Sequence, residues 1–306
     1  MAMKNDILKR FFDYVEIRTK ITSLFAFIMT LAYLFYLKQA IDFKLTAVFF
    51  LSMFLFDLTT TAINNYIDTK TNTQVLQFYR KTALIIIIVL LAVSTALGLY
   101  LAWCTDIVVL ALGALCFLCG VFYTYGPIPI SRQPIGEIFS GVFYGLLIPF
   151  ILLYINMPKG TYIDLQMIDY TLILKVNLLP IASVLLLSAA PVCTTANIML
   201  ANNICDVEKD IKVKRYTLPY YIGKKSLKLF AALYYIIYII AVIMVLVKVF
   251  PPIYLLFLLS LIPVHKNIKY FMEKQEKSST FIYSIKNYII IMASNSLAIF
   301  LSGLVG

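Results

Sequence analysis

The stretch Thr82–Trp103, TALIIIIVLLAVSTALGLYLAW, decides the fold class, because it contains no charged side chain. A membrane-spanning α-helix needs about 20 mostly apolar residues in succession. The same character extends along the whole chain of 306 residues, of which 62% are hydrophobic and 13% are charged. Soluble domains average about 25% charged residues. The sequence therefore predicts an all-α, polytopic membrane helical bundle.

Nine apolar segments are predicted to span the membrane. They are 21–37, 45–63, 82–103, 107–124, 137–156, 177–203, 227–247, 251–264 and 287–305. The eighth is short, begins at Pro251 and ends near Pro263, so we expect a bent helix there. No small-residue cleavage site follows the first segment, which is therefore expected to be retained as a helix. Together the spans are predicted to form a single transmembrane domain over residues 1–306.

The net charge of +11 is unevenly distributed along the chain. Most of the 26 Lys and Arg residues precede the first predicted span or follow the second, fourth, sixth and eighth. Because positive residues favour the cytoplasmic side, the N-terminus and these connections are predicted to be cytoplasmic, in a bacterial-type cell membrane. Membrane topology and attraction to anionic lipid headgroups account for the charge, so we expect no nucleic-acid partner.

Cysteine and histidine do not predict a metal or redox site. The five cysteines are too scattered for a disulfide framework. Cys116 and Cys119 form a C-x-x-C within an apolar run, where they are expected to pack as small hydrophobic side chains. His265 is the single histidine, so a histidine-rich metal site is excluded.

Two predicted cytoplasmic segments carry carboxylates and amides at helical spacing. Asn64 and Asp68, after the second span, are four residues apart, and Asn202, Asp206 and Asp210, after the sixth span, repeat that spacing. If each helix continues past the bilayer, residues four apart share one face. Carboxylate and amide oxygens are ligands that Mg²⁺ accepts, commonly together with phosphates of a substrate. The pattern predicts a magnesium site.

Basic residues adjoin both segments, and cations bind phosphate oxygens. They are Lys70, Arg80 and Lys81 near the first segment and Lys212, Lys214 and Arg215 near the second. Capping and turn chemistry, or anchoring of the chain at the membrane face, are the alternatives for either segment alone. Their repetition at the ends of two even-numbered spans favours a diphosphate site. Asp57, within the second span, is expected to point inward beneath Asn64 and Asp68.

These segments resemble those of the UbiA superfamily of intramembrane aromatic prenyltransferases, whose members carry two such motifs after the second and sixth of nine helices. The second motif is most similar to the 1,4-dihydroxy-2-naphthoate polyprenyltransferase branch, N-N-x-x-D-x-x-x-D followed by a basic pair and Thr-Leu. The matching positions are Asn202, Asn203, Asp206, Asp210, Lys214 or Arg215, Thr217 and Leu218. Cys205 stands where the branch has an arginine, and Lys214 where it has a glycine.

Further stretches are similar to the same branch, so the resemblance covers nearly the whole chain. They are Tyr123-Thr124-Tyr125-Gly126-Pro127-Ile128-Pro129, the following Gly136-Glu137, and Arg18-Thr19-Lys20 before the first span. The first motif departs from the family pattern. Asn65 replaces its first aspartate, and Asn72 or Gln74 stands where its last carboxylate is expected. Loss of negative charge is expected to weaken Mg²⁺ binding there, with Asp57 as a hypothetical compensating carboxylate.

The resemblance implies Mg²⁺-dependent transfer of a polyprenyl group from an allylic diphosphate to an aromatic acid. The expected acceptor is 1,4-dihydroxy-2-naphthoate, prenylated with loss of its carboxylate to give a demethylmenaquinone. Asp68, Asp206 and Asp210 are the expected catalytic metal ligands. The expected supporting residues are Asn64 as a further metal ligand, Asn202 and Asn203 as amide ligands or orienting groups, Arg80, Lys214 and Arg215 at the diphosphate, and Tyr123, Tyr125 and Glu137 near the acceptor.

Several alternatives remain open at the level of sequence. The tyrosines could form an interfacial belt, and Glu137 could be a helix N-terminal charge. The acceptor could be 4-hydroxybenzoate or homogentisate. A transporter would account for Asp57 and the broken eighth span, although the two N-x-x-x-D segments repeat in parallel order whereas many transporters contain inverted repeats. A non-catalytic lipid- or quinone-binding homologue would account for the missing carboxylate.

Overall fold

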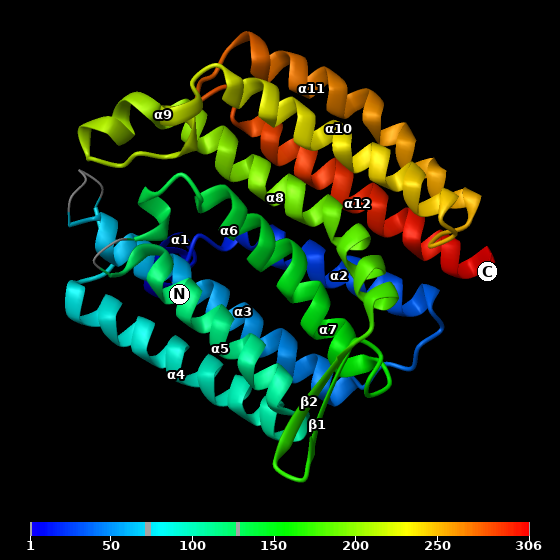
Figure 1. Cartoon of the computed structure of the whole chain (residues 1–306). Coiled ribbons are helices and arrows are strands. Elements are labelled where there is room, and N and C mark those ends of the chain that lie inside the picture. Colours follow the sequence, from blue (N-terminus) through cyan, green and yellow to red (C-terminus); the bar gives the residue numbers. More distant parts are fainter. Residues whose placement is uncertain (1, 71–74, 127–128, 306) are drawn as a thin grey trace. The chain divides into compact units, whose positions relative to one another are not determined.

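The structure, a computed structural model, describes residues 2–70, 75–126 and 129–305. Its internal contacts divide the chain into two compact units, each built from two segments. The first unit contains Met1–Leu24 and Phe43–Ser131, and the second contains Phe25–Asp42 and Arg132–Gly306. Helices dominate both units (Figure 1). The predicted all-α membrane bundle is confirmed, whereas the single-domain organisation stays a prediction.

The first unit consists mainly of long apolar helices. Its elements are α1 (Ala2–Tyr14), the 3-10 helix η1 (Ile17–Lys20), α3 (Phe43–Asp68), α4 (Arg80–Cys104) and α5 (Ile107–Thr124). Helices α3, α4 and α5 lie side by side (Figure 1). The turn between α4 and α5 is short because Asp106 caps α5, its Oδ1 accepting from the backbone N–H of Val108 at 2.9 Å.

The second unit contains more, and more varied, elements. Apart from α2 (Ile21–Tyr36), which enters it from the first unit, they are α6 (Gly136–Val142), the π-helical turn η3 (Phe143–Leu147), α7 (Ile148–Asn156), β1 (Ile163–Ile168), β2 (Thr171–Val176), α8 (Leu178–Lys212), α9 (Leu218–Ile222), α10 (Lys225–Leu246), the 3-10 helix η4 (Pro252–Ser260), α11 (Leu261–Glu273) and α12 (Ile282–Val305). A 3-10 turn, η2 (Ile130–Arg132), lies at the boundary of the two units. Helix α8 packs against α6, α10 and α12.

Two glycines bring α6 and η3 unusually close to α8. A Cβ atom at Gly145 would lie 2.3 Å from the backbone nitrogen of Val192, and one at Gly141 would lie 2.8 Å from the Val192 carbonyl oxygen. Only glycine allows this approach, and small residues commonly serve such crossings between membrane helices. The crossing lies beside Pro191, inside α8. It holds α6, which carries Glu137, against the helix that carries the second motif.

Buried amides and hydroxyls join further helices of this unit. The Asn197 side chain on α8 donates to the Phe230 carbonyl on α10 at 3.0 Å. The Tyr254 hydroxyl on η4 donates to Asn295 Oδ1 on α12 at 2.6 Å. Such bonds satisfy polar groups where lipid and apolar side chains offer none, so they fix the helices against one another.

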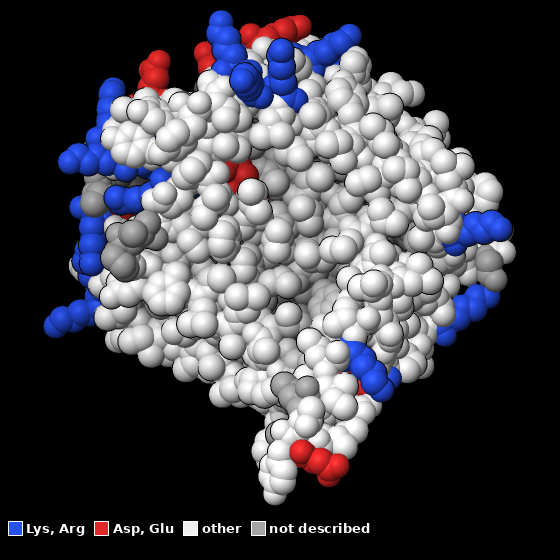
Figure 2. Space-filling model, viewed as in Figure 1, with Lys and Arg blue, Asp and Glu red and all other residues white. Residues whose placement is uncertain are grey.

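The predicted spans agree well with the observed helices. Among the described residues, eight helices are long and apolar enough to cross a membrane. They are Ile17–Tyr36, Phe43–Asp68, Arg80–Cys104, Ile107–Thr124, Gly136–Asn156, Leu178–Lys212, Lys225–Leu246 and Ile282–Val305. The remaining predicted span, 251–264, is helical but changes from 3-10 to α at Leu261, so it is not one of the eight. In the face seen in Figure 2, most charged side chains lie near the margins and the area between them is mostly white.

Helix α3 continues to Asp68 and α8 to Lys212, so both motifs lie on the helices themselves, as the expected shared faces require. Two features of the fold were not predicted. The connection between α7 and α8 forms the antiparallel hairpin β1–β2, and helix α1 precedes the first span. Hydropathy marks the apolar spans but carries no signal for short elements outside them.

Candidate active site

The second motif lies on one face of the C-terminal part of α8. Asn203, Asp206 and Asp210 are all buried, whereas Asn202 is half-buried. Burial of carboxylates is costly unless cations or hydrogen-bond donors accompany them. Both aspartates have such partners, and these partners define the electrostatics of the site.

Asp206 is held between two lysines. Its Oδ2 contacts Lys277 Nζ, which belongs to the connection between α11 and α12. Its Oδ1 lies 3.5 Å from Nζ of Lys209, one turn further along α8. Sequence reasoning missed Lys277, because 71 residues separate it from Asp206. The only available signal was its place in the basic connection after the predicted eighth span.

Asp210 is paired with Arg215 through the turn that ends α8. The backbone N–H of Arg215 donates to the Asp210 carbonyl at 2.9 Å, and that of Lys214 donates to the Ile211 carbonyl at 3.1 Å. This pair of bonds is the Schellman arrangement, which places one residue in the left-handed region. That residue is Lys214, with φ of 56°. The turn directs the side chain of Arg215 back, with its Nε 3.9 Å from Asp210 Oδ2.

The turn also explains a departure from the pattern of the resembling branch. That branch has glycine at the position of Lys214, and glycine adopts a left-handed backbone without steric cost. Here a lysine adopts it with an exposed side chain. The predicted basic residues Lys214 and Arg215 therefore lie beside the motif, with Arg215 the one that contacts it.

Glu137 supports the motif from α6. Asn203 Nδ2 donates to Glu137 Oε1 at 2.8 Å, and both side chains are buried. This bond fixes the amide orientation and leaves Asn203 Oδ1 as an acceptor. Glu137 thus acts as an orienting partner of Asn203, a role that sequence reasoning did not assign to it.

The oxygens of this cluster fit a divalent cation. Within the described part of the chain, Asn203 Oδ1, Asp206 Oδ1, Asp210 Oδ2 and Glu137 Oε2 are buried and accept no hydrogen bond. Buried oxygens are nearly always satisfied in proteins, by donors, water or a metal ion. An all-oxygen set suits Mg²⁺. No three His, Cys, Asp or Glu side chains of residues 2–70, 75–126 and 129–305 gather closely enough to form a cage of their own.

The first motif lies at the C-terminal end of α3, where Asn64 and Asp68 are half-buried. Asn65 Nδ2 donates to the Tyr14 carbonyl at the end of α1, at 2.8 Å. Tyr14 is fully buried, and its hydroxyl donates to the Ala62 carbonyl at 3.1 Å. An ionised aspartate has no hydrogen to donate at position 65. The amide that replaces the family aspartate therefore has a structural role, which ties α3 to α1.

Arg80 binds the same end of α3. Its Nη1 donates to the Tyr66 carbonyl at 3.1 Å and its Nη2 to the Thr69 carbonyl at 3.2 Å. These carbonyls belong to the unpaired set at a helix C-terminus, where a cation is favourable. The predicted contact of Arg80 with diphosphate stays a prediction. Asn72 and Gln74 lie outside the described residues.

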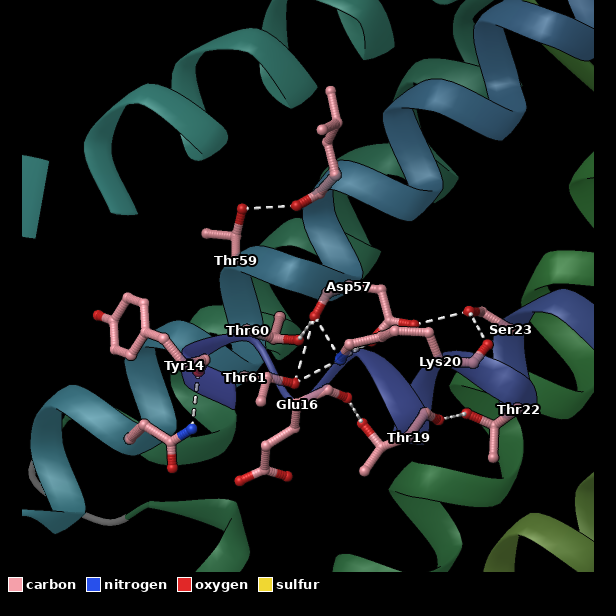
Figure 3. A network of polar contacts seen from close by, with 12 residues as sticks. Tyr14, Glu16, Thr19, Lys20, Thr22, Ser23, Asp57, Thr59, Thr60 and Thr61 are labelled. Carbon is pink, nitrogen blue, oxygen red and sulfur yellow. Dashed lines mark hydrogen bonds and ion pairs between the residues drawn. The ribbon is translucent and has the colours of Figure 1, made fainter. Parts of the chain in front are cut away.

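Asp57 is buried in a network of its own (Figure 3). Its Oδ1 lies 2.8 Å from Lys20 Nζ, and its Oδ2 accepts from the Ser23 hydroxyl at 2.6 Å. Lys20 and Asp57 are 1% and 5% exposed. Both carboxylate oxygens are thus engaged, which fixes η1 and the start of α2 against α3. This occupation gives no support to Asp57 as a compensating metal ligand.

The residues expected near an acceptor are distributed over both units. Tyr123 is half-buried on α5, and Tyr125 is exposed just after that helix. Pro127 and Ile128 of the same stretch lie outside the described residues. Glu137 is placed by its bond to Asn203. A common role of the three at one acceptor ring stays a prediction.

Fold and site together define an integral, multi-pass membrane protein with a buried, oxygen-rich and cation-paired cluster on one helix end. Residues 24–285 match the model of the UbiA prenyltransferase family. The chain belongs to this family.

One curated relative bears on the acceptor. The chain is 31% identical, over 160 residues, to the 1,4-dihydroxy-2-naphthoate octaprenyltransferase of Bacillus subtilis (strain 168). The match covers 52% of this chain and 45% of that enzyme, so the chain spans less than half of the relative's length.

Solved structures of low sequence identity share the fold. A structure described as digeranylgeranylglyceryl phosphate synthase has a TM-score of 0.66 at 18% identity, covering 98% of this chain and 99% of the other. A UbiA homologue from Aeropyrum pernix K1 has a TM-score of 0.64 at 15% identity, covering 88% of this chain and 96% of the other. A UbiA homologue from Archaeoglobus fulgidus, bound to GPP and Mg²⁺, has a TM-score of 0.60 at 15% identity, covering 95% of this chain and 99% of the other.

Proposed function

We propose that this protein transfers a polyprenyl group from an allylic diphosphate to 1,4-dihydroxy-2-naphthoate, with loss of the acceptor's carboxylate, to give a demethylmenaquinol, the reduced form of a demethylmenaquinone. The single observation that carries the proposal is the oxygen cluster on α8, in which the two aspartates are paired with Lys277 and Arg215. Family membership supports the reaction class. The Bacillus subtilis relative supports the acceptor.

Asp206 and Asp210 are the proposed metal ligands on α8, with Asn202 and Asn203 as amide ligands or orienting groups. Asp68 and Asn64 on α3 are the ligands proposed from the first motif. Mg²⁺ bound there would neutralise charge that develops on the departing diphosphate. The Archaeoglobus fulgidus homologue, which shares the fold, is described as bound to GPP and Mg²⁺, and this supports the choice of metal.

The cations beside the cluster are proposed to bind the diphosphate. Cleavage of the allylic C–O bond leaves the electron pair on the diphosphate, and ammonium or guanidinium groups stabilise that charge. Lys277 and Arg215 already face the carboxylates, so each needs only to exchange a carboxylate oxygen for a phosphate oxygen. Lys214 and Arg80 are proposed further diphosphate contacts. Glu137 keeps Asn203 oriented throughout.

A ring carbon of the acceptor then attacks the allylic carbon. A new C–C bond to the prenyl group replaces the C–O bond that was broken, and the ring carboxylate leaves as carbon dioxide. Tyr123, Tyr125 and Glu137 are the proposed neighbours of the ring. The polyprenyl tail is proposed to run among apolar helices, since a chain of isoprene units has no group to hydrogen-bond. The N-terminus and both motif-bearing helix ends are proposed to face the cytoplasm.

The experiment uses full-length protein in lipid nanodiscs with a labelled polyprenyl diphosphate and Mg²⁺. The naphthoate, 4-hydroxybenzoate and homogentisate are offered separately, and both diphosphate release and product mass are measured. The expected product forms with the naphthoate and has lost carbon dioxide. Formation of product with 4-hydroxybenzoate alone would overturn the assignment of the naphthoate as the acceptor. Binding of the prenyl diphosphate without turnover of any acceptor would instead indicate a non-catalytic homologue.

A further inference from the structure

The connection between α7 and α8 is an antiparallel hairpin that joins two membrane-spanning helices. Its turn consists of Asp169 and Tyr170, with φ of 47° and 64°. Positive φ at both central residues is the pattern of the tight turns that favour hairpins. Since its strands lie between the end of one candidate span and the start of the next, the base of the hairpin is near the point where the chain leaves and re-enters a membrane.

The register of the hairpin places only apolar side chains on one face and a mixture of polar and apolar side chains on the other. Ile163 pairs with Val176 and Leu165 with Leu174 on one face. On the other face Asp164 pairs with Lys175, Gln166 with Ile173, and Ile168 with Thr171. Side chains alternate between the faces of a strand, so this difference follows directly from the sequence pattern. One face is thus wholly apolar at the described positions nearest the base of the hairpin.

The apolar face continues into the exposed start of α8. Leu174 is 59% exposed, and Leu178 and Leu179, the first residues of α8, are 77% and 80% exposed. Tyr170, at the tip of the hairpin, is fully exposed. Exposed large apolar side chains gathered on one segment mark a surface that binds something apolar. Because α8, which begins at Leu178, is long and apolar enough to cross a membrane, the exposed leucines at its start adjoin a candidate membrane span.

The base of the hairpin is firmly attached, so its orientation is set by the helices. Asn177 Nδ2 donates to the Gly160 carbonyl at 2.7 Å, and the Asn177 N–H donates to the Tyr162 carbonyl at 2.9 Å. Tyr162 is buried, with its ring 5.6 Å from the ring of Phe150 on α7. These contacts connect both strands to α7 and to the first residue before α8. The hairpin therefore does not swing as a free loop.

We propose that the β1–β2 hairpin is an interfacial membrane anchor whose apolar face, Ile163, Leu165, Leu174 and Val176, lies in the boundary between lipid headgroups and acyl chains. A two-stranded hairpin is at best marginally stable alone in water, and burial of one face in lipid supplies the missing stabilisation. Tyr170 suits the same boundary, where tyrosine is enriched. This inference rests on the membrane fold and is independent of the proposed reaction.

The chain has a single tryptophan, Trp103, so one substitution removes its own tryptophan fluorescence. Trp103 is replaced by Phe, and tryptophan is introduced by Leu174→Trp on the apolar face or by Ile173→Trp on the opposite, mixed face. Full-length protein is reconstituted into phosphatidylcholine vesicles with bromine atoms in the upper acyl chain. Neighbouring residues point to opposite faces, so we expect L174W to be quenched about twofold or more strongly than I173W.

Equal quenching of the two variants, or stronger quenching of I173W, would overturn the proposal. If protection of L174W from quenching increased with the ratio of protein to lipid, a second copy of the chain would cover the apolar face. That result would also overturn the proposal. Because residues 173 and 174 are adjacent at the same depth in the hairpin, differences in overall folding cannot imitate the expected alternation. A second pair, Val176→Trp against Lys175→Trp, must repeat the pattern.

Discussion

Lys277 contacts the carboxylate of Asp206 from the connection between α11 and α12, although 71 residues separate them in the sequence. Lys209 approaches the other oxygen of the same carboxylate at 3.5 Å. A proposed metal ligand is therefore already neutralised by the chain's own cations. This arrangement places a basic group beside a carboxylate proposed to hold the metal, and it makes the connection between α11 and α12 part of the candidate site.

Substitution Lys277→Met should weaken binding of prenyl diphosphate by about tenfold or more, because a charge-assisted hydrogen bond to phosphate is worth about 1.5–3 kcal/mol. Binding of Mn²⁺ alone should become tighter, since a competing cation has been removed from Asp206. Calorimetric titration measures both. The matched control is Lys274→Met in the same connection, whose ammonium pairs with Glu276 at 2.9 Å. The prediction requires weaker binding of prenyl diphosphate together with tighter binding of Mn²⁺. If both affinities of K277M were unchanged, Lys277 would not belong to the candidate site.

Asp206→Asn and Asp210→Asn should each lower diphosphate release by about 100-fold or more, because each change removes a charged metal ligand from the reacting centre. Glu208→Gln is the matched control, since Glu208 lies between them on α8 but is exposed. Release of labelled diphosphate from purified protein is the measurement. If D206N and D210N were as active as E208Q, the metal assignment to α8 would be wrong.

Asn65→Asp restores the family residue but should destabilise this protein by about 1–3 kcal/mol. The amide hydrogen bond to the Tyr14 carbonyl is lost, and a carboxylate oxygen is brought against that carbonyl. The thermal unfolding midpoint in detergent should fall below that of Asn65→Ala, in which only the bond is lost. A rise in the midpoint together with tighter Mn²⁺ binding would show that position 65 can still serve as a metal ligand.

Lys214→Gly should stabilise the turn after α8 by about 1 kcal/mol, since a left-handed backbone costs a residue with a side chain roughly that amount. Lys212→Gly, at the end of α8, is the control and should be neutral or destabilising, because glycine is a poor helix former. Thermal unfolding compares the two. A lower midpoint for K214G than for K212G would contradict the assignment of strain to Lys214.

Removal of one partner from the buried Lys20–Asp57 pair should cost about 3–5 kcal/mol, because the other charge is left buried without compensation. Lys20→Met and Asp57→Leu are therefore each expected to be strongly destabilised. The double variant should be more stable than either, as measured by unfolding in a double-mutant cycle. Additive losses would mean that the two charges do not act as a pair.

Hydropathy and spacing predicted that the polar side chains of the second motif share a face of one helix. Asn202, Asp206 and Asp210 repeat at helical spacing, and the continuation of α8 to Lys212 places all three on that helix. Neither the contact between Lys277 and Asp206 nor the bond between Glu137 and Asn203 could be predicted in this way, because each joins positions remote in sequence. Side chains on different helices meet only after packing is complete, and no local pattern encodes which of them meet.

The stretch Thr82–Trp103 and its counterparts determined the membrane bundle by themselves, because transfer of a long apolar segment into lipid depends on composition and length alone. The repeated N-x-x-x-D spacing likewise determined the candidate residues for a magnesium site. Only the tertiary structure decided that Asn65 is a structural donor, that Asp57 is neutralised by Lys20, and that Asp206 faces Lys277. The physical reason is that charge and hydrogen-bond pairing depend on distance in space, whereas hydropathy and helical periodicity depend only on neighbours along the chain.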